Sequence, residues 1–459
     1  MSCNRFDRRG FIRRTAGLAA AGLAAPYIFT ESSSAAPGQK LRVAAIGVGG
    51  RGSEIARQAG LLGQIVAVCD VDRTKAQAFA DKHAKGAPIY RDFRDVLRRS
   101  DVDVVTIGTP DHWHVAIAMA AMKAGKDVYC EKPLTLTVEE GKLVCQAVKQ
   151  TGRVFQVGTQ QRSEYKEAFL KAVVIARSGR LGKKLHAVSS VGKAASRSAD
   201  KDKPFGPFKI QDPPASLDWD LWLGQAPKVP YCLERTGWNF RWWFEYSGGQ
   251  VTDWGVHHTD IAFWALAGDE GQAVSAQGQG QFMAVPREHV RDFLLGKRSA
   301  SDMSPAYNVV HEFDVDIELT TGNTIKLVSG PNELVIEGEN GRIRVNRGGL
   351  KGKIAEDIAA SASDTKWLED EVVKLYRGKK PVPHMANFFQ CVASRELPIS
   401  DVFSHVRAVN ACHLANIAMV LNRKIRWDPS AQRFIGDDEA NRLCARKQRS
   451  PYTIGELAG

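Results

Sequence analysis

The chain has 459 residues, a formal net charge of +12, eight cysteines and a hydrophobic fraction of 44%. This length excludes a small disulfide-stapled module, and this apolar content excludes a disordered chain. Two or three domains are expected, and the lack of an apolar run of about 18 residues argues against a membrane span. The cysteines show no Cys-x-x-Cys spacing, so we expect reduced thiols and neither a zinc knuckle nor a disulfide framework.

The N-terminal stretch is typical of a targeting signal. Arg8 and Arg9 precede Gly-Phe-Ile, an apolar segment covers residues 16–29, and small residues follow it. A charged start, a short apolar middle and a small-residue end indicate a secretory signal, and the arginine pair resembles the twin-arginine export signal. We expect residues 1–36 to be this signal peptide, read by the twin-arginine export machinery. The protein would then fold in the cytoplasm and work in the periplasm or elsewhere outside; the alternative is a frayed basic helix.

The next part of the chain, residues 37–157, alternates short apolar runs with helical stretches. The expected strands cover 41–46, 65–69, 102–107, 127–130 and 154–157, and the expected helices cover 53–62, 73–83, 111–124 and 138–150. Buried strands separated by helices are typical of a parallel sheet that is covered on both faces. The sequence therefore predicts an N-terminal Rossmann domain that binds a dinucleotide.

A glycine-rich turn follows the first expected strand and opens a helix. It runs from Gly47 to Gly52 as Gly-Val-Gly-Gly-Arg-Gly, and Asp70 ends the second expected strand. Gly47 permits the tight turn, Gly49 lets the pyrophosphate approach the helix N-terminus, and Gly52 allows close packing. Asp70 would accept hydrogen bonds from the adenosine ribose, which favours NAD. Arg73 leaves NADP open, because an arginine can accommodate a 2′-phosphate. The alternative is a glycine turn without a ligand.

Two later strand ends carry polar motifs on the same side of the sheet. One contains Thr109-Pro110 and His114, and the other reads Glu131-Lys132-Pro133. Ligands of doubly wound sheets bind beyond the carboxyl ends of the strands, so both motifs face the cofactor. Pro133 keeps the backbone of Lys132 extended, so the lysine is expected to project into the cleft. The alternative is that Lys132 is a solvated surface residue. The predicted cofactor-binding residues are Gly47, Gly49, Gly50, Arg51, Gly52, Asp70, Arg73, Thr109, Pro110, His114, Glu131 and Lys132.

Together these motifs resemble the Gfo/Idh/MocA family of glucose–fructose oxidoreductase, inositol dehydrogenase and MocA proteins. The stretch 247–260 is similar to the family's Gly-Gly-Gly…Asp-x-Gly-x-His-x-x-Asp pattern, with Ser247 in place of the first glycine. The resemblance runs from about residue 41 to the C-terminus. It implies an NAD(P)-dependent oxidoreductase acting on CH–OH groups, with Lys132, Asp253 and His257 at the catalytic positions.

The roles of these three residues follow from the chemistry of alcohol oxidation. Asp253 and His257 are four residues apart and would share one face of a helix. We expect His257 to take the hydroxyl proton, Lys132 to polarise the oxygen, and Asp253 to orient both. A metal site built on Asp253, His257, His258 and Asp260 is the rival reading. No further histidine or cysteine cluster completes it, so we expect no metal. Asp260 is expected to be structural.

Residues 158–459 change in composition and are expected to form a second domain. Polar and apolar residues alternate over 311–319, and further strands are expected near 180–189 and over 324–328, 334–338 and 342–345. This fits the open, mostly antiparallel sheet of the family's C-terminal α/β domain, which serves substrate binding and subunit contact. A homo-oligomer is therefore expected. The tail from residue 384 to residue 421 is expected to be helical.

Candidate substrate contacts cluster near the catalytic motif. Seven of the ten tryptophans lie between residues 219 and 264, and aromatic faces beside a guanidinium are typical of a carbohydrate subsite. Core packing is the alternative for most of these tryptophans. The predicted substrate residues are Gln160, Arg162, Arg241, Trp242 and His258. For His258, the alternative is that it is only a packed, structural histidine.

The leading function is an exported oxidoreductase that acts on a sugar, sugar acid or cyclitol. Outside the cytoplasm there is no free nicotinamide pool, so the cofactor should be tightly bound and internally recycled. One alternative is an NAD-dependent glycoside hydrolase or lyase that works through a transient keto sugar. Another is a non-catalytic sugar- or cofactor-binding protein, against which the presence of all three catalytic positions speaks. Nucleic-acid binding is not expected, because the basic run 193–203 is interrupted by aspartates.

Overall fold

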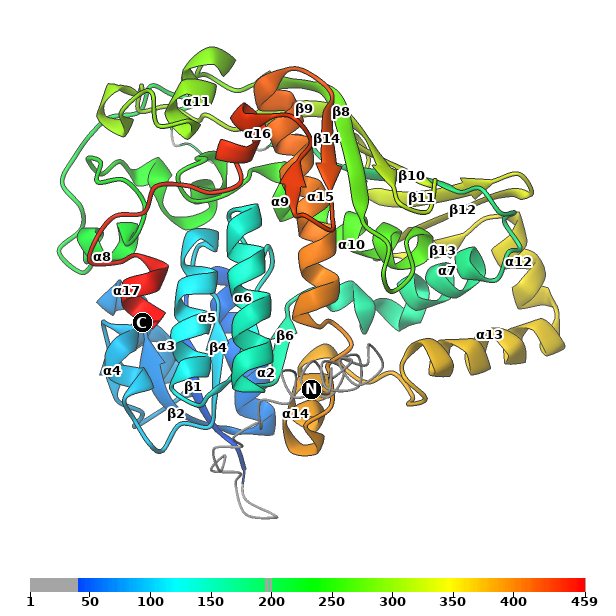
Figure 1. Cartoon of the computed structure of the whole chain (residues 1–459). Coiled ribbons are helices and arrows are strands. Elements are labelled where there is room, and N and C mark those ends of the chain that lie inside the picture. Colours follow the sequence, from blue (N-terminus) through cyan, green and yellow to red (C-terminus); the bar gives the residue numbers. More distant parts are fainter. Residues whose placement is uncertain (1–39, 195–197, 199, 459) are drawn as a thin grey trace, which may run out of the picture.

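The structure, a computed structural model, describes residues 40–194, 198 and 200–458. The predicted signal over residues 1–36 lies outside these ranges. Two sheets organise the chain: a parallel sheet drawn with its helices in blue to cyan, and a larger open sheet drawn mostly in green and yellow (Figure 1). Within these ranges, no helix combines the length and apolar content needed to cross a bilayer. All cysteines in the described part of the chain are free thiols.

The first sheet has the doubly wound Rossmann topology. Its six parallel strands lie in the order β3-β2-β1-β4-β5-β6. The strands are β1 (Arg42–Ile46), β2 (Gln64–Cys69), β3 (Ile89–Tyr90), β4 (Val104–Ile107), β5 (Asp127–Cys130) and β6 (Phe155–Val157). The helices are α2 (Gly50–Leu62), α3 (Arg73–His83), α4 (Phe93–Leu97), α5 (His114–Lys123) and α6 (Val138–Thr151). The Rossmann prediction is confirmed. The short β3 and α4 were not predicted, because two and five residues give too little periodicity to detect.

The second sheet is open and mostly antiparallel, as predicted. Its nine strands lie in the order β13-β12-β11-β7-β10-β9-β8-β14-β15, and β7 pairs with β10 in parallel. The strands are β7 (His186–Val191), β8 (Ala273–Phe282), β9 (Val310–Leu319), β10 (Thr324–Ser329), β11 (Glu333–Gly338), β12 (Gly341–Asn346), β13 (Gly349–Lys351), β14 (Ile425–Asp428) and β15 (Arg433–Phe434). The long β8 was missed because its glycines and glutamines have low strand propensity.

Helices cover one face of the open sheet. The helices of this half are α7 (Ala168–Arg177), α8 (Trp219–Leu223), α9 (Gln250–Asp253), α10 (Gly255–Leu266), α11 (Arg287–Leu294), α12 (Lys353–Ala360), α13 (Ala362–Leu375) and α16 (Asp438–Arg442). All twelve residues of α10 are buried, and this helix packs against β7, β10 and β11. The helix that carries His257 is therefore held rigidly between the sheet and the cavity described below.

Three C-terminal helices lie against the Rossmann domain. The expected helical tail 384–421 is two helices, α14 (His384–Ser394) and α15 (Val402–Leu421), with α17 (Ile454–Ala458) close to the C-terminus. α14 packs on α2, α15 on α6, and α17 on α5 (Figure 1). Phe388 of α14 shares one hydrophobic cluster with Val43 and Val104 of the parallel sheet. These three helices thus complete the cover of the first domain.

Candidate active site

A cavity of about 580 Å³ lies at the carboxyl ends of the parallel strands, where doubly wound sheets bind ligands. Its walls come from both halves of the chain. The glycine turn, Asp70 and Lys132 contribute from the Rossmann domain, and His257 and Arg347 contribute from the second domain. A ligand in this cavity would contact both domains at once, as is usual for cofactor sites.

The glycine turn is shaped to receive a diphosphate. Gly47 has φ +74°, and a Cβ atom at Gly52 would lie 1.8 Å from the Gly47 carbonyl oxygen, so neither position tolerates a side chain. Above Gly50, in contrast, a Cβ would meet nothing within 4 Å. The first turn of α2 therefore presents its backbone N–H groups to open space, which fits the pyrophosphate of NAD. The predicted Gly49 and Arg51 also line the cavity.

Asp70 lies at the end of β2 and faces the cavity, as predicted for the residue that binds the ribose hydroxyls. Its Oδ2 accepts a hydrogen bond from the Val48 N–H, and its Oδ1 accepts one from the Asp72 N–H, both at 2.9 Å. Burial raises the pKa of this carboxyl above its ordinary value. Arg73, which was predicted to accommodate a 2′-phosphate, is exposed at the start of α3 and does not line the cavity. Lys75, one half-turn further along, lines the cavity instead.

The other predicted cofactor residues also border the cavity. Thr109, Pro110 and His114 follow β4, and Glu131 follows β5. The two ring nitrogens of His114 lie 2.7 Å from the Pro133 carbonyl oxygen and 2.9 Å from that of Thr109. The histidine thus ties the loop after β4 to the loop after β5, which carries Lys132. In the same wall, the Arg51 Nε donates to Glu131 Oε1 at 3.0 Å.

Lys132 and Asp253 form the polar centre of the cavity. The Lys132 Nζ donates to Asp253 Oδ1 at 2.6 Å and to the Asp253 carbonyl oxygen at 3.0 Å. The Arg241 Nε lies 3.1 Å from the same Oδ1. Burial alone would raise the pKa of Asp253, but Arg241 and Lys132 lower it to about 2, so this carboxylate is ionised. An ammonium group has three donors, and the third N–H of Lys132 is left for a substrate oxygen.

His257 is positioned by Arg347, and the prediction that Asp253 orients it is wrong. Asp253 ends α9 and His257 lies in α10, so the two are not on one continuous helix, although both line the cavity. The Arg347 Nη2 donates to His257 Nε2 at 3.3 Å, which places the ring proton on Nδ1. Burial, Lys132 and Arg347 lower the pKa of His257 well below its ordinary value. The imidazole is therefore neutral, and its basic nitrogen is occupied.

A buried carboxyl that the sequence analysis missed borders the same cavity. Asp111 follows β4, and its Oδ2 accepts a hydrogen bond from the Ser247 hydroxyl at 2.6 Å. Ser247 is the residue that departs from the glycine of the family pattern. Burial raises the pKa of Asp111 to about 7, with Asp253 adding to the shift and Ser247 and Arg241 opposing it. At neutral pH this side chain is poised between acid and carboxylate.

This shift predicts a pH-dependent stability that Asp111→Asn removes. The folded-state pKa lies above the ordinary value, so the contribution of Asp111 to folding is complete below about pH 4 and is lost as the pH rises through about 7. The free energy of unfolding of the wild type, relative to Asp111→Asn, should therefore fall between these values. Urea unfolding of both proteins at a series of pH values measures this difference. A difference that is constant from pH 5 to pH 8 would contradict the assignment.

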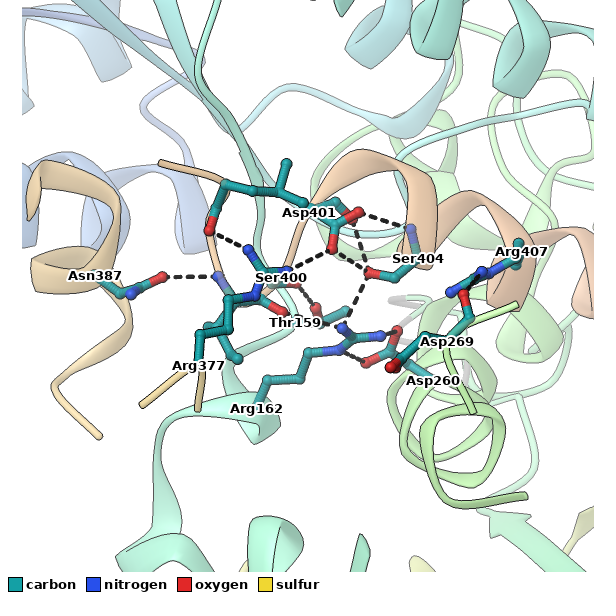
Figure 2. A network of polar contacts seen from close by, with 12 residues as sticks. Thr159, Arg162, Asp260, Asp269, Arg377, Asn387, Ser400, Asp401, Ser404 and Arg407 are labelled. Atoms are coloured by element: carbon teal, nitrogen blue, oxygen red, sulfur yellow. Dashed lines mark hydrogen bonds and ion pairs between the residues drawn. The ribbon is translucent and has the colours of Figure 1, made fainter. Parts of the chain in front are cut away.

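Three predicted substrate residues lie elsewhere. Arg162 is wrong because it is buried in the network of Figure 2, where Nε and Nη2 donate to the two carboxylate oxygens of Asp260, each at 2.7 Å. Trp242 is fully buried in the core of the second domain. His258 donates through Nε2 to Asn332 Oδ1 at 2.6 Å and does not border the cavity. These residues support the site without facing it.

Gln160 and Arg241 do line the cavity, as predicted. The Gln160 amide donates to Glu131 Oε1 at 2.9 Å. Aromatic residues that were not singled out complete this wall: Tyr165, Trp222, Trp238, Phe240 and Trp254. The tryptophan cluster in the sequence indicated such a wall, but it did not show which tryptophans face inward. The described residues contain no group of three or more His, Cys, Asp or Glu side chains placed to hold a metal ion.

The chain combines a Rossmann sheet that carries a glycine turn with an open-sheet domain that closes the cavity. This combination defines a two-domain, NAD-binding oxidoreductase architecture. Family models agree with this class. Residues 41–159 match the oxidoreductase family's NAD-binding Rossmann fold, and residues 203–284 and 293–454 match its C-terminal alpha/beta domain. The chain therefore belongs to the Gfo/Idh/MocA family of oxidoreductases.

Individual relatives share parts of the chain. An inositol 2-dehydrogenase of Salmonella typhimurium is 36% identical over 149 residues, which are 32% of this chain and 44% of the relative. A glycosyl hydrolase family 109 protein of Shewanella pealeana is 29% identical over 208 residues, 40% of this chain and 45% of the relative. The chain thus spans less than half the length of the curated relatives it matches.

One solved structure shows how far the fold is shared. The WlbA dehydrogenase of Bordetella pertussis, solved in complex with NADH and UDP-GlcNAcA, superposes with a TM-score of 0.57 at 18% identity. The superposition covers 85% of this chain and 99% of that one. Both domains of the described structure therefore have the arrangement seen in that dehydrogenase.

Proposed function

We propose that this protein is an NAD-dependent oxidoreductase that transfers hydride between the nicotinamide and a hydroxyl-bearing carbon of a sugar, sugar acid or cyclitol. The observation that carries the proposal is the pairing of Lys132 with Asp253 in a cavity that also holds the glycine turn and Asp70. The inositol dehydrogenase relative supports the substrate class. The proposal has three further parts. They are export through the twin-arginine route, a tightly bound and internally recycled cofactor, and homo-oligomerisation.

The chain's own residues have to handle the oxygen and the proton of the alcohol. Bound NAD supplies the hydride acceptor, and loss of hydride from carbon requires loss of the hydroxyl proton. The remaining N–H of Lys132 can donate to the alcohol oxygen and stabilise the charge that develops there. Asp253 keeps Lys132 in place. His257 is the nearby base, and its Nε2 can take the proton once Arg347 no longer occupies it.

A second candidate is hydrolysis or elimination of a glycoside through a transient keto sugar, favoured by the glycosyl hydrolase family 109 relatives. In that chemistry the hydride returns to the sugar, so no net oxidation results. A neighbouring C–H of the keto sugar must lose a proton. Asp111 is a buried acid–base group beside Lys132 that could exchange this proton. The two candidates share the first step and differ in the product.

The proposal predicts that the purified protein retains NAD(H) through dialysis. Native mass spectrometry should find one dinucleotide per chain. Addition of an oxidisable sugar, without added cofactor, should raise the near-ultraviolet absorbance of reduced nicotinamide, and a second, reducible sugar should reverse the change. Release of an aglycone or an unsaturated sugar without net oxidation would favour the second candidate. A protein that neither retains nor binds NAD would contradict both.

A further inference from the structure

Arg347 is a cation in the cavity wall. It occupies the turn between β12 and β13. Three cations, Lys132, Arg241 and Arg347, gather at this end of the cavity with the ionised Asp253. Lys132 and Arg241 both pair with Asp253, at 2.6 Å and 3.1 Å. Among the described residues, no carboxylate lies within ion-pair distance of Arg347, so this end of the cavity has an excess of positive charge.

The guanidinium of Arg347 is held in place by aromatic rings. Its central carbon lies 4.5 Å from the ring centroid of Trp254 and 4.9 Å from that of Tyr165. Tyr165, Lys166 and Glu167 have φ values of +62°, +52° and +61°, which non-glycine residues adopt only where the surroundings enforce them. Rings that stack on a guanidinium leave its N–H edge for a ligand in the plane. Arg347 is thus oriented before any ligand binds.

The present hydrogen-bond partner of Arg347 is a weak one. Its Nη2 donates to the neutral His257 Nε2 at 3.3 Å. A guanidinium prefers a carboxylate, which can accept two parallel N–H bonds and carries the opposite charge. An anion that enters the cavity would therefore compete successfully with His257 for this arginine.

We propose that Arg347 binds an anionic group of the substrate, that the substrates are sugar acids, and that this binding frees His257 Nε2 to accept the hydroxyl proton. The assignment rests on the proposed function and narrows its substrate class. A carboxylate fits better than a phosphate. Lys132 and Arg241 already pair with Asp253, whereas Arg347 offers a planar fork of N–H donors, which matches the two oxygens of a carboxylate.

The surrounding charges support this coupling between binding and basicity. Burial, then Lys132, Arg347, His258 and Arg51, all lower the pKa of His257. The titratable or charged groups that act on Arg347 itself are Tyr165, Arg51, Glu131 and Asp253. A carboxylate on Arg347 would offset the repulsion between this cation and a protonated His257. The substrate would then make its own base more basic at the moment when the proton must be taken.

Binding to the full-length protein loaded with NADH tests the proposal without turnover. Calorimetry would compare D-glucuronate, D-galacturonate and D-mannuronate with their parent hexoses and with D-glucose 6-phosphate. At least one acid should bind about 10- to 100-fold more tightly than its hexose. Arg347→Met should weaken the binding of the acid far more than that of its hexose and so abolish this preference, and Arg347→Lys should retain part of it. Arg344→Met, on the preceding strand β12 and paired with Glu333, is the matched control and should retain all of it.

Several results would overturn the proposal. The wild type could bind acids and hexoses equally, or it could bind the sugar phosphate more tightly than the acids. Arg347→Met could weaken acids and hexoses equally, or it could lose affinity for NADH. Hydride transfer, measured separately, distinguishes this inference from the proposed function. Transfer with neutral sugars and no preference for acids supports the function and overturns the role of Arg347. Arg347-dependent binding of an acid that is never oxidised upholds the role of Arg347 and contradicts the function.

Discussion

Lys132→Met should lower kcat by about a thousandfold, while the affinity for NAD changes by less than about threefold. Loss of one positioned donor to a developing oxyanion costs about 10²–10³-fold in kcat, and the loss of the ammonium charge also removes electrostatic stabilisation of the alkoxide. Methionine has a similar length and leaves the cavity wall filled. The Lys132 ammonium contacts Asp253, and the substitution leaves the glycine turn that would hold the diphosphate intact, so the dinucleotide should still bind.

The measurement is a comparison of pre-steady-state hydride transfer and of NAD binding in the same preparations. Lys142→Met, on α6 and away from the cavity, is the control and should behave as the wild type. Asp253→Asn should show a smaller loss than Lys132→Met, because it removes the charge that holds the lysine and leaves the lysine present. Turnover of Lys132→Met within twofold of the wild type would contradict the catalytic role.

Asp260→Asn should reduce the free energy of unfolding by about 3–5 kcal/mol. The Arg162–Asp260 pair is fully buried, and the Arg162 Nη1 also donates to the Ile399 carbonyl oxygen and to Ser404 Oγ, both at 3.0 Å (Figure 2). Removal of one partner leaves the other charge buried without compensation. Because this network joins η2 (Gln160–Arg162), α10 and α15, its loss should also loosen the helix that carries His257.

Urea unfolding at neutral pH measures this loss, and a double variant keeps the test informative. Arg162→Met combined with Asp260→Leu removes both charges and should be more stable than Asp260→Asn alone. The exposed pair Arg180–Asp364, at 2.6 Å, provides the contrast: Asp364→Asn should cost less than about 1 kcal/mol. Equal costs at the two sites would contradict the view that burial makes the Arg162–Asp260 pair so sensitive.

The parts of the structure that were predictable from sequence are those whose signal is local. The strands of the parallel sheet are buried on both faces and appear as apolar runs, and the glycine turn and Asp70 stand at their ends in a fixed spacing. The motif that contains Asp253 and His257 is also local. These features located the Rossmann domain, the cavity and most of its cofactor side.

The errors arose where a side chain's direction depends on a partner far along the chain. Arg162 stands just past a strand end, where a side chain can face the cleft, but Asp260, 98 positions later, draws it into the core. Arg347 lies 90 positions after His257, in a short turn with no distinctive motif. Which tryptophans face the cavity was equally hidden, because short 3-10 turns such as η5 (Gly237–Trp242) give no clear periodicity.

The placement of α14 and α17 has a consequence for synthesis on the ribosome. The parallel sheet leaves the ribosome early, yet Phe388 and Met385, which share a cluster with its strands, come more than 200 residues later. Ile454 packs into the core on its other side and emerges later still. The nucleotide-binding half should therefore remain incompletely covered, and open to chaperones, until α17 has been translated. Removal of α17 should then impair the Rossmann domain, although that domain is made long before this helix.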